Sequence, residues 1–167
     1  MSQTLAIQMY IAAKWKPELI GKTPQEKARV YQMLTLVNDG FVDKIITPNV
    51  KSADQMANYE TAKAAFTPIV ERLSSQNFIC GDKVTVPDFM LFEAINFLSI
   101  LGSPQGMSDS SKVFQDFPYL LAYQKRMSSL SGLKEYLASS KHIEHPFFPP
   151  FFQCKLKKAD GTLEHPQ

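Results

Sequence analysis

The pattern of apolar and polar residues predicts a chain built from helices, with one of them at its centre. Residues 86–101 are apolar on almost every side, and Glu93, Asn96 and Ser99 are the only polar side chains after the first turn. A helix without a polar face is unsuited to contact with water. We therefore expect the helix over 86–101 to form the core around which the other helices pack.

The residues before this central helix predict its first turn in detail. Gly81 and Asp82 are turn residues, and Thr85 is the expected N-cap, whose hydroxyl would accept a backbone N–H. Asp88, three residues later, is expected to complete a capping box by accepting the N–H of Thr85. Because turn and capping chemistry account for both aspartates, they do not indicate a pair of catalytic carboxylates.

A second long helix is predicted earlier in the chain. Thr23 is its expected N-cap, a proline occupies its first position, and Glu26 would close a capping box. Apolar residues then recur in steps of three and four, which is helical spacing. Gly40 lies inside this run and weakens the helix by about 1 kcal/mol. The Thr-Pro-Asn sequence at 47–49 is expected to end it.

A third helix is expected to follow from a capping box that begins at Ser52 and to continue to residue 73. Pro68 should interrupt and kink it, because a proline ring clashes with the carbonyl four residues earlier. Residues 102–112 have the composition of a loop.

Two shorter helices complete the predicted bundle. One opens at 117–123, and the other covers 132–140 with Ser131 as its cap. No segment predicts a strand. The expected fold is therefore an all-α bundle of about six helices whose antiparallel neighbours are joined by short loops.

Both ends of the chain are unusually apolar. Residues 5–15 contain only two polar side chains, so a helix there needs cover on more than one side. Residues 147–152 read Phe-Phe-Pro-Pro-Phe-Phe, and the prolines predict an extended segment. Four phenylalanines so close together are expected to lie on a surface, either of this chain or of a partner.

Composition narrows the class of protein. The chain has 167 residues, of which 44% are hydrophobic and 20% charged, as expected for one globular domain. A net charge of +2 is too balanced for a nucleic-acid-binding protein. No apolar run approaches the ~20 residues that a membrane-spanning helix needs. The N-terminus has neither a secretory nor a transit pattern.

The cysteines indicate an intracellular protein. Cys80 and Cys154 lie far apart without metal-ligand spacing, which is typical of reduced thiols. We expect a cytoplasmic location, with a mitochondrial or cytoskeletal assembly as the alternative.

The only dense set of metal-ligating residue types is His142, Glu144 and His145. Two histidines and a carboxylate suit zinc, but the remote His165 is the only further histidine, and Pro146 breaks any local helix. We interpret the set as a polar segment that leaves the last helix, and we predict no metal site. The chain also lacks a glycine-rich phosphate loop and a recognisable nucleophile elbow.

Residues 78–89, Phe-Ile-Cys-Gly-Asp-Lys-Val-Thr-Val-Pro-Asp-Phe, carry a resemblance to a known family. They resemble the capping-box and staple motif of cytosolic glutathione transferases, most closely the mu class. The resemblance covers about residues 3–150. It extends to further segments of the same family pattern: 7–12, 19–23 with Glu26, 117–120, Leu133-Lys134, and Tyr136 with 139–141.

This resemblance implies a domain organisation. Residues 1–150 would form a C-terminal-type helical domain of the family, within which 1–15 would be a remnant of the last helix of the thioredoxin-like domain. Residues 146–167 would form an extended Phe/Pro-rich and polar tail. The chain is expected to begin where the thioredoxin-like domain of the family ends.

The resemblance also bears on chemistry. The family's thioredoxin-like domain supplies the hydroxyl that stabilises the glutathione thiolate, and the mu-class second-site tyrosine would fall at Ile69, which has no hydroxyl. Only Gln3 and Thr4 resemble the Gln-Ser pair that holds the γ-glutamyl end of glutathione, as a vestigial contact. A thiol of pKa ≈ 8.5 needs a positioned donor to become thiolate at neutral pH. We therefore expect no catalytic residue and no cofactor.

The resulting hypothesis is a non-catalytic structural or interaction subunit that docks into a larger protein assembly. Thr85 and Asp88 would serve the fold, and the partner-binding residues would lie at both ends of the chain: Leu5, Met9, Ile11, Trp15, Phe147, Phe148, Phe151 and Phe152. The alternative is a glutathione-dependent enzyme or ligand binder whose thioredoxin half comes from another chain, with glutathione as its cofactor.

Overall fold

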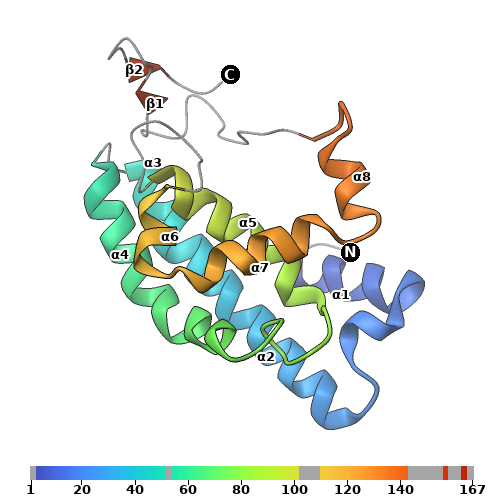
Figure 1. Cartoon of the computed structure of the whole chain (residues 1–167). Coiled ribbons are helices and arrows are strands. Elements are labelled where there is room, and N and C mark those ends of the chain that lie inside the picture. The colour runs from blue at the N-terminus through green and yellow to red at the C-terminus, as the bar shows by residue number, and fades with distance from the viewer. Residues whose placement is uncertain (1–2, 52–53, 102–109, 143–155, 158–162, 165–167) are drawn as a thin grey trace.

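The computed structural model describes residues 3–51, 54–101, 110–142, 156–157 and 163–164 (Figure 1). Within these ranges the chain forms eight α-helices: α1 Thr4–Trp15, α2 Pro24–Gly40, α3 Thr47–Lys51, α4 Gln55–Val70, α5 Val86–Leu101, α6 Lys112–Asp116, α7 Tyr119–Ser128 and α8 Leu133–Leu137. Short 3-10 helices cover Pro17–Ile20 and Glu71–Ser74. The all-α prediction is confirmed.

The central position of α5 is also confirmed. Its buried residues run from Val86 to Leu101 with few interruptions, and Leu91, Ala94 and Ile95 are completely inaccessible to solvent. Helices α2, α4, α6 and α7 all pack against it, so that α5 runs through the middle of the bundle in Figure 1. Most of the apolar sequence of α5 is therefore covered, with Phe89 36% exposed.

Helix α2 begins as predicted and ends differently. The Thr23 hydroxyl accepts the N–H of Glu26 at 3.2 Å, and the Glu26 carboxylate accepts the N–H of Thr23 at 2.9 Å. The expectation that 47–49 ends the helix is wrong, because a π-helical segment, Phe41–Ile46, continues into α3. Pro48 therefore lies inside a continuous helical run from Pro24 to Lys51, just after the π-helical turn.

Gly40, at the end of α2, permits close packing against α4. A Cβ atom at this position would lie 3.0 Å from the ring of Phe66, which is fully buried. The sequence alone suggested only the helix-weakening effect of glycine, whereas the structure gives the glycine a packing role.

We expect the Gly40→Ala variant to be less stable by about 1–2 kcal/mol, because the clash with Phe66 outweighs the higher helix propensity of alanine. Urea unfolding measures the change. In a Phe66→Leu background the same substitution should cost less, since the smaller side chain removes the clash. A stabilising effect of Gly40→Ala in the wild-type background would contradict this packing role.

Helix α4 differs from its prediction at both ends. Asp54 is the N-cap, and its carboxylate accepts the N–H of Ala57 at 3.0 Å. The predicted cap, Ser52, lies outside the described residues. Pro68 does not end the helix, which continues to Val70 and then into the 3-10 segment Glu71–Ser74. Proline acts on the carbonyl four residues earlier, so the kink predicted at Pro68 concerns the turn before it and stays a prediction.

The C-terminal part contains a second correction. Ser131 is not a cap, since the N–H of Gly132 donates to the Glu135 carboxylate and α8 ends at Leu137. Gly132 has a φ of 83°, which favours glycine. Lys112, predicted as loop, begins α6.

Two-residue antiparallel strands, β1 Leu156–Lys157 and β2 Leu163–Glu164, form a pair that the sequence did not predict. The predicted aromatic segment 147–152 lies outside the described residues.

None of the helices that the structure describes is long and apolar enough to cross a membrane.

Candidate functional site

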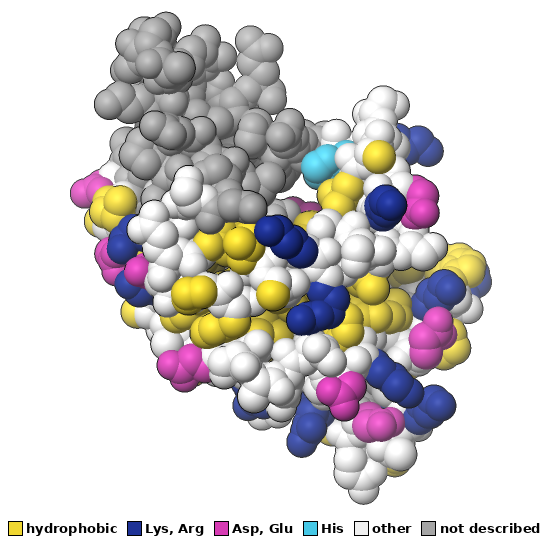
Figure 2. All heavy atoms as spheres, viewed as in Figure 1, with side chains coloured by type: hydrophobic (Ala, Val, Ile, Leu, Met, Phe, Trp, Pro, Cys, Tyr) yellow, Lys and Arg dark blue, Asp and Glu magenta, His cyan; other side chains and the backbone are white. Residues whose placement is uncertain are grey.

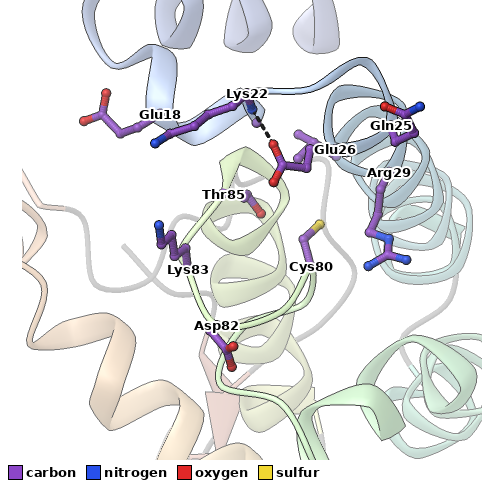
Figure 3. Close-up of a pocket in the computed structure, with 11 residues that line it drawn as sticks. Glu18, Lys22, Gln25, Glu26, Arg29, Cys80, Asp82, Lys83 and Thr85 are labelled. Carbon is purple, nitrogen blue, oxygen red and sulfur yellow. Dashed lines mark hydrogen bonds between the residues drawn. The ribbon is translucent and has the colours of Figure 1, made fainter.

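An open groove of about 760 Å³ lies between the start of α2 and the turn before α5. One wall carries Lys22 and Arg29, and the other carries Lys83, as Figure 3 shows. Val30 and Cys80 supply its apolar surface. Capping chemistry builds both walls, since the capping box of α2 fixes one wall and the first turn of α5 fixes the other.

Three acidic residues, Glu18, Glu26 and Asp82, line this groove beside its three basic ones. The Glu26 carboxylate accepts the N–H groups of Lys22 and Thr23 at 2.7 and 2.9 Å, and these bonds lower the pKa of Glu26. Glu18 lies 3.8 Å from Lys16, and its carboxylate points outward in Figure 3. Asp82 also points away from the other side chains drawn there. The groove therefore carries charges of both signs, with three acidic and three basic residues in its lining.

Cys80 is a half-buried free thiol on the floor of the groove. Burial raises its pKa above the ordinary value of 9.0, and the negative charge of Asp88 acts in the same direction. The hydroxyl of Thr85 and the positive charge of Arg29 oppose this shift without reversing it. A raised pKa disfavours the thiolate, which is the nucleophilic form of a cysteine.

We expect Cys80 to react slowly with iodoacetamide. In a Cys154→Ser background at pH 7, its rate should be at least about 3-fold below that of an unstructured cysteine peptide, because less thiolate is present. The rate should rise with pH along a curve displaced above that of the peptide. A rate equal to or faster than that of the peptide at pH 7 would contradict the raised pKa.

Asp88 lies behind the groove and joins three parts of the chain. Its carboxylate accepts the N–H of Ile79 at 2.9 Å, the N–H and hydroxyl of Thr85 at 2.8 and 2.9 Å, and the hydroxyl of Tyr123 at 3.1 Å. Asp88 is completely buried, and burial raises its pKa although these bonds oppose the shift.

The predicted capping box is therefore only half present. Asp88 does accept the N–H of Thr85, whereas the Thr85 hydroxyl donates to Asp88 instead of accepting a backbone N–H. The bonds from Ile79 and Tyr123 come from outside the helix start, so local capping does not account for all of the hydrogen bonds that Asp88 accepts. No local pattern pointed to Tyr123, which lies 35 residues away.

Helix α1 presents a row of large apolar side chains to solvent. Ile7, Tyr10, Ile11 and Trp15 are 40%, 47%, 49% and 59% exposed. Lys14 lies over the Trp15 ring, 4.6 Å from its centroid. Figure 2 shows hydrophobic side chains beside basic ones on this flank of the molecule. We call these four apolar residues the α1 face.

The structure divides the predicted partner-binding residues of α1 into two groups. Ile11 and Trp15 belong to the α1 face, whereas Leu5 and Met9 pack against the core beside Ala12. Spacing by three and four residues explains the division, because it places 7, 11 and 15 on one side of a helix. Sequence reasoning missed Ile7 and Tyr10, although this spacing could have identified them.

Other predicted site residues lie apart from the groove. Gln3 and Thr4 are exposed at the start of α1, and Gln3 has a φ of 76°. His142 contacts the ring of Tyr136 edge-on, with 5.6 Å between ring centroids. Within the described ranges, no group of His, Cys, Asp and Glu is arranged to hold a metal ion.

Comparison with known proteins identifies the helical domain. Residues 30–140 match the family model described as "Glutathione S-transferase, C-terminal domain". The chain belongs to the glutathione S-transferase family. The match includes most of α2 and all of α4 and α5, with the turn before α5, whereas the groove wall that carries Lys22 and Arg29 precedes it.

Relatives of several transferase classes are similar to this chain. A glutathione S-transferase class-mu 26 kDa isozyme of Schistosoma mansoni is 29% identical over 154 residues, which cover 87% of this chain and 63% of the relative. Glutathione S-transferase P of Bos taurus is 30% identical over 139 residues, which cover 77% of this chain and 60% of the relative. The chain thus spans less than two thirds of these transferases. The similar identities do not decide the class.

Solved transferase structures share the fold. The crystal structure of the glutathione S-transferase Blo t 8 matches with a TM-score of 0.68 at 20% identity, covering 92% of this chain and 70% of the other. At this identity the likeness concerns the fold alone.

Proposed function

We propose that this glutathione S-transferase-type helical domain is a non-catalytic interaction subunit that docks onto another protein through the α1 face. The observation that carries the proposal is the row of exposed apolar side chains on one side of α1, up to 59% exposed at Trp15. Groups of large apolar residues at the surface are typical of protein–protein contacts.

Energetics supports a covered α1 face. At ~25 cal/mol per Å², covering a few hundred Å² of apolar surface contributes several kcal/mol to association. Trp15 and Tyr10 pack edge-on at 6.2 Å, and Lys14 lies over both rings. Aromatic residues held in place lose little freedom on binding and are frequent at the energetic centre of interfaces.

The groove supports a role without catalysis. Cys80 is the thiol among the residues that line it, and its raised pKa disfavours the thiolate. Asp88 is fully buried behind the groove and does not line it.

The proposal is tested by measuring the mass of the native particle that contains the tagged full chain. An Ile11→Asp/Trp15→Asp variant should run at a smaller mass than the wild type, since two charges then occupy the α1 face. The matched control is Tyr31→Asp/Leu36→Asp, which changes exposed apolar residues of α2 (56% and 45% exposed) and should leave the particle intact. Equal behaviour of the two variants would overturn the proposal.

The relatives favour one alternative function. They are named glutathione S-transferases, and this chain spans 63% of the first of them. In the alternative, a thioredoxin-like half covers the α1 face, supplied by another chain or by a longer product of the same gene, and the assembly binds glutathione. Retention of the native particle on glutathione resin, with conjugating activity, would favour this alternative over the proposal.

A further inference from the structure

Lys14 lies at one end of the α1 face and is the only charged residue of α1. Its ammonium is 4.6 Å from the centroid of the Trp15 ring, 5.7 Å from that of the Tyr10 ring and 3.5 Å from the Tyr10 hydroxyl. Within the ranges that the structure describes, it forms no ion pair with a carboxylate. The cation therefore lies on the same two rings that a docked partner would cover.

The charged side chains beside the α1 face are basic. Residues 1–17 contain no Asp or Glu, and Lys16 is the only other Lys or Arg among them. Lys16 lies 3.8 Å from Glu18, the first acidic residue of the sequence, so a carboxylate is already close to its charge. Lys14 has no such carboxylate, although its side chain is held in place by the rings.

Covering the α1 face would take the Lys14 ammonium out of water. A buried ammonium is costly in free energy unless an opposite charge and hydrogen-bond acceptors meet it. Trp15 is 59% exposed, and a partner that covers the side of its ring where Lys14 lies covers the ammonium as well. A partner of this face therefore needs a carboxylate at the place where Lys14 crosses the ring.

The α1 face also indicates the shape of the partner. Ile7, Ile11 and Trp15 follow one another in steps of four, so the row extends for about 12 Å along the helix. The backbone groups inside a helix are paired with one another, so α1 offers no edge to which a strand could be added. An amphipathic helix has apolar side chains at the same spacing and can lie alongside such a row.

We propose that the occupant of the α1 face is an amphipathic helix of a partner protein, with a carboxylate in its first turn that pairs with Lys14. This assignment of the partner rests on the proposed function, because both concern the α1 face. The partner helix runs antiparallel to α1, so that its N-terminal end meets the C-terminal end of α1. A carboxylate in its first turn then interacts favourably both with the Lys14 ammonium and with the dipole of its own helix.

The test uses the purified full chain and a fluorescein-labelled helical peptide of about 16 residues, with leucines in steps of four and one glutamate in its first turn. A second peptide has glutamine in place of the glutamate. In fluorescence polarisation, the wild type should bind the glutamate peptide at least about 5-fold more tightly than the glutamine peptide. The Lys14→Met variant should bind the two peptides within about 2-fold of each other, because the charge that distinguishes them is gone.

Lys16→Met is the matched control, because it removes the same charge two residues away from a lysine that has Glu18 beside it. It should keep the preference for the glutamate peptide. Both lysines are exposed, so neither substitution should affect the fold. Ile11→Asp/Trp15→Asp should bind neither peptide, since it removes the apolar row that the leucines contact.

Equal affinity of the wild type for the two peptides would overturn the assignment of an acidic helix. An unchanged preference in Lys14→Met would do the same, as would binding of the glutamate peptide to Ile11→Asp/Trp15→Asp or no binding at about 1 mM peptide. Binding of phosphatidylserine vesicles without binding of the glutamate peptide would also overturn it and would indicate a lipid surface.

The mass of the native particle tests the proposed function separately, because that measurement asks only whether the α1 face is needed. If Ile11→Asp/Trp15→Asp reduces this mass while the two peptides bind equally, the docking role stands and the acidic helix alone is wrong. If the variant leaves the mass unchanged, the docking role itself fails.

Discussion

Replacing Asp88 with alanine is expected to destabilise the chain by about 4 kcal/mol. The substitution removes the acceptor for the N–H groups of Ile79 and Thr85 and for the hydroxyls of Thr85 and Tyr123. Ile79 is 1% exposed and Thr85 is 8% exposed, so water cannot readily replace the lost acceptor. Each buried donor left without a partner costs about 1–3 kcal/mol.

Graded variants separate the contributions to this site. Asp88→Asn should cost less than Asp88→Ala, about 2 kcal/mol, because asparagine keeps one acceptor oxygen but turns an amide toward the N–H of Thr85. Tyr123→Phe should cost about 1 kcal/mol, since it removes one hydroxyl that donates to Asp88. Urea unfolding gives all three values.

The control for Asp88 is Asp82→Ala. Asp82 belongs to the same turn but is exposed, so its loss should change the unfolding free energy by less than about 0.5 kcal/mol. If Asp88→Ala were as mild as Asp82→Ala, the carboxylate would not hold the turn, α5 and α7 together as the structure shows.

The sequence predicted the parts of this fold that depend on local pattern. The bounds of α5 follow from its apolar run, and the start of α2 follows from Thr23 and Glu26, because capping boxes and helical periodicity act over three or four residues. The π-helical turn before α3 could not be predicted in this way, since its continuation past Pro48 depends on packing against α4 and α5.

The groove was not predicted at all, for a related reason. Lys22 and Arg29 are far from Lys83 in the sequence, and each looks like an ordinary surface residue until α2 and α5 pack together. The α1 face was predicted in outline from its composition. Which residues of α1 are buried and which are exposed depends on the rotation of the helix about its own axis. Ala12 sets this rotation by packing into the core.

Asp116 forms the second polar junction that sequence reasoning missed, and it ties α6 to α4. Its carboxylate accepts the hydroxyl of fully buried Tyr59 at 2.7 Å and lies 2.8 Å from Lys63 and 3.4 Å from Lys112. Desolvation acts to raise the pKa of Asp116, but the bonds from Lys63 and Tyr59 outweigh it, so the pKa lies below the ordinary value of 3.8. Burial and the same bond raise the pKa of Tyr59 well above its usual range.

We expect Asp116→Ala to destabilise the chain by about 2–3 kcal/mol at pH 7, mainly because it leaves the buried Tyr59 hydroxyl without an acceptor. Glu60→Gln is the control, because Glu60 lies 3.7 Å from Lys63 and Lys112 at a more exposed position and should contribute less than about 0.5 kcal/mol. Urea unfolding of the two variants at pH 7 measures both changes. Equal losses of unfolding free energy in the two variants would contradict the larger contribution assigned to Asp116.

The pH dependence of stability distinguishes Asp116 from Asp88. Because the pKa of Asp116 is lowered in the folded chain, its stabilising effect is present above pH 3.8 and is lost as the pH falls through the folded-state pKa. The difference in unfolding free energy between wild type and Asp116→Ala should therefore narrow on acidification.

The pKa of Asp88 is raised, so its ionisation lowers stability as the pH rises from 3.8 through the folded-state pKa. The difference in unfolding free energy between wild type and Asp88→Asn should therefore decrease as the pH rises, which is opposite to the trend for Asp116. Unfolding curves of both pairs between pH 3 and pH 8 test the signs, and parallel profiles would contradict the opposite shifts of the two carboxyl groups.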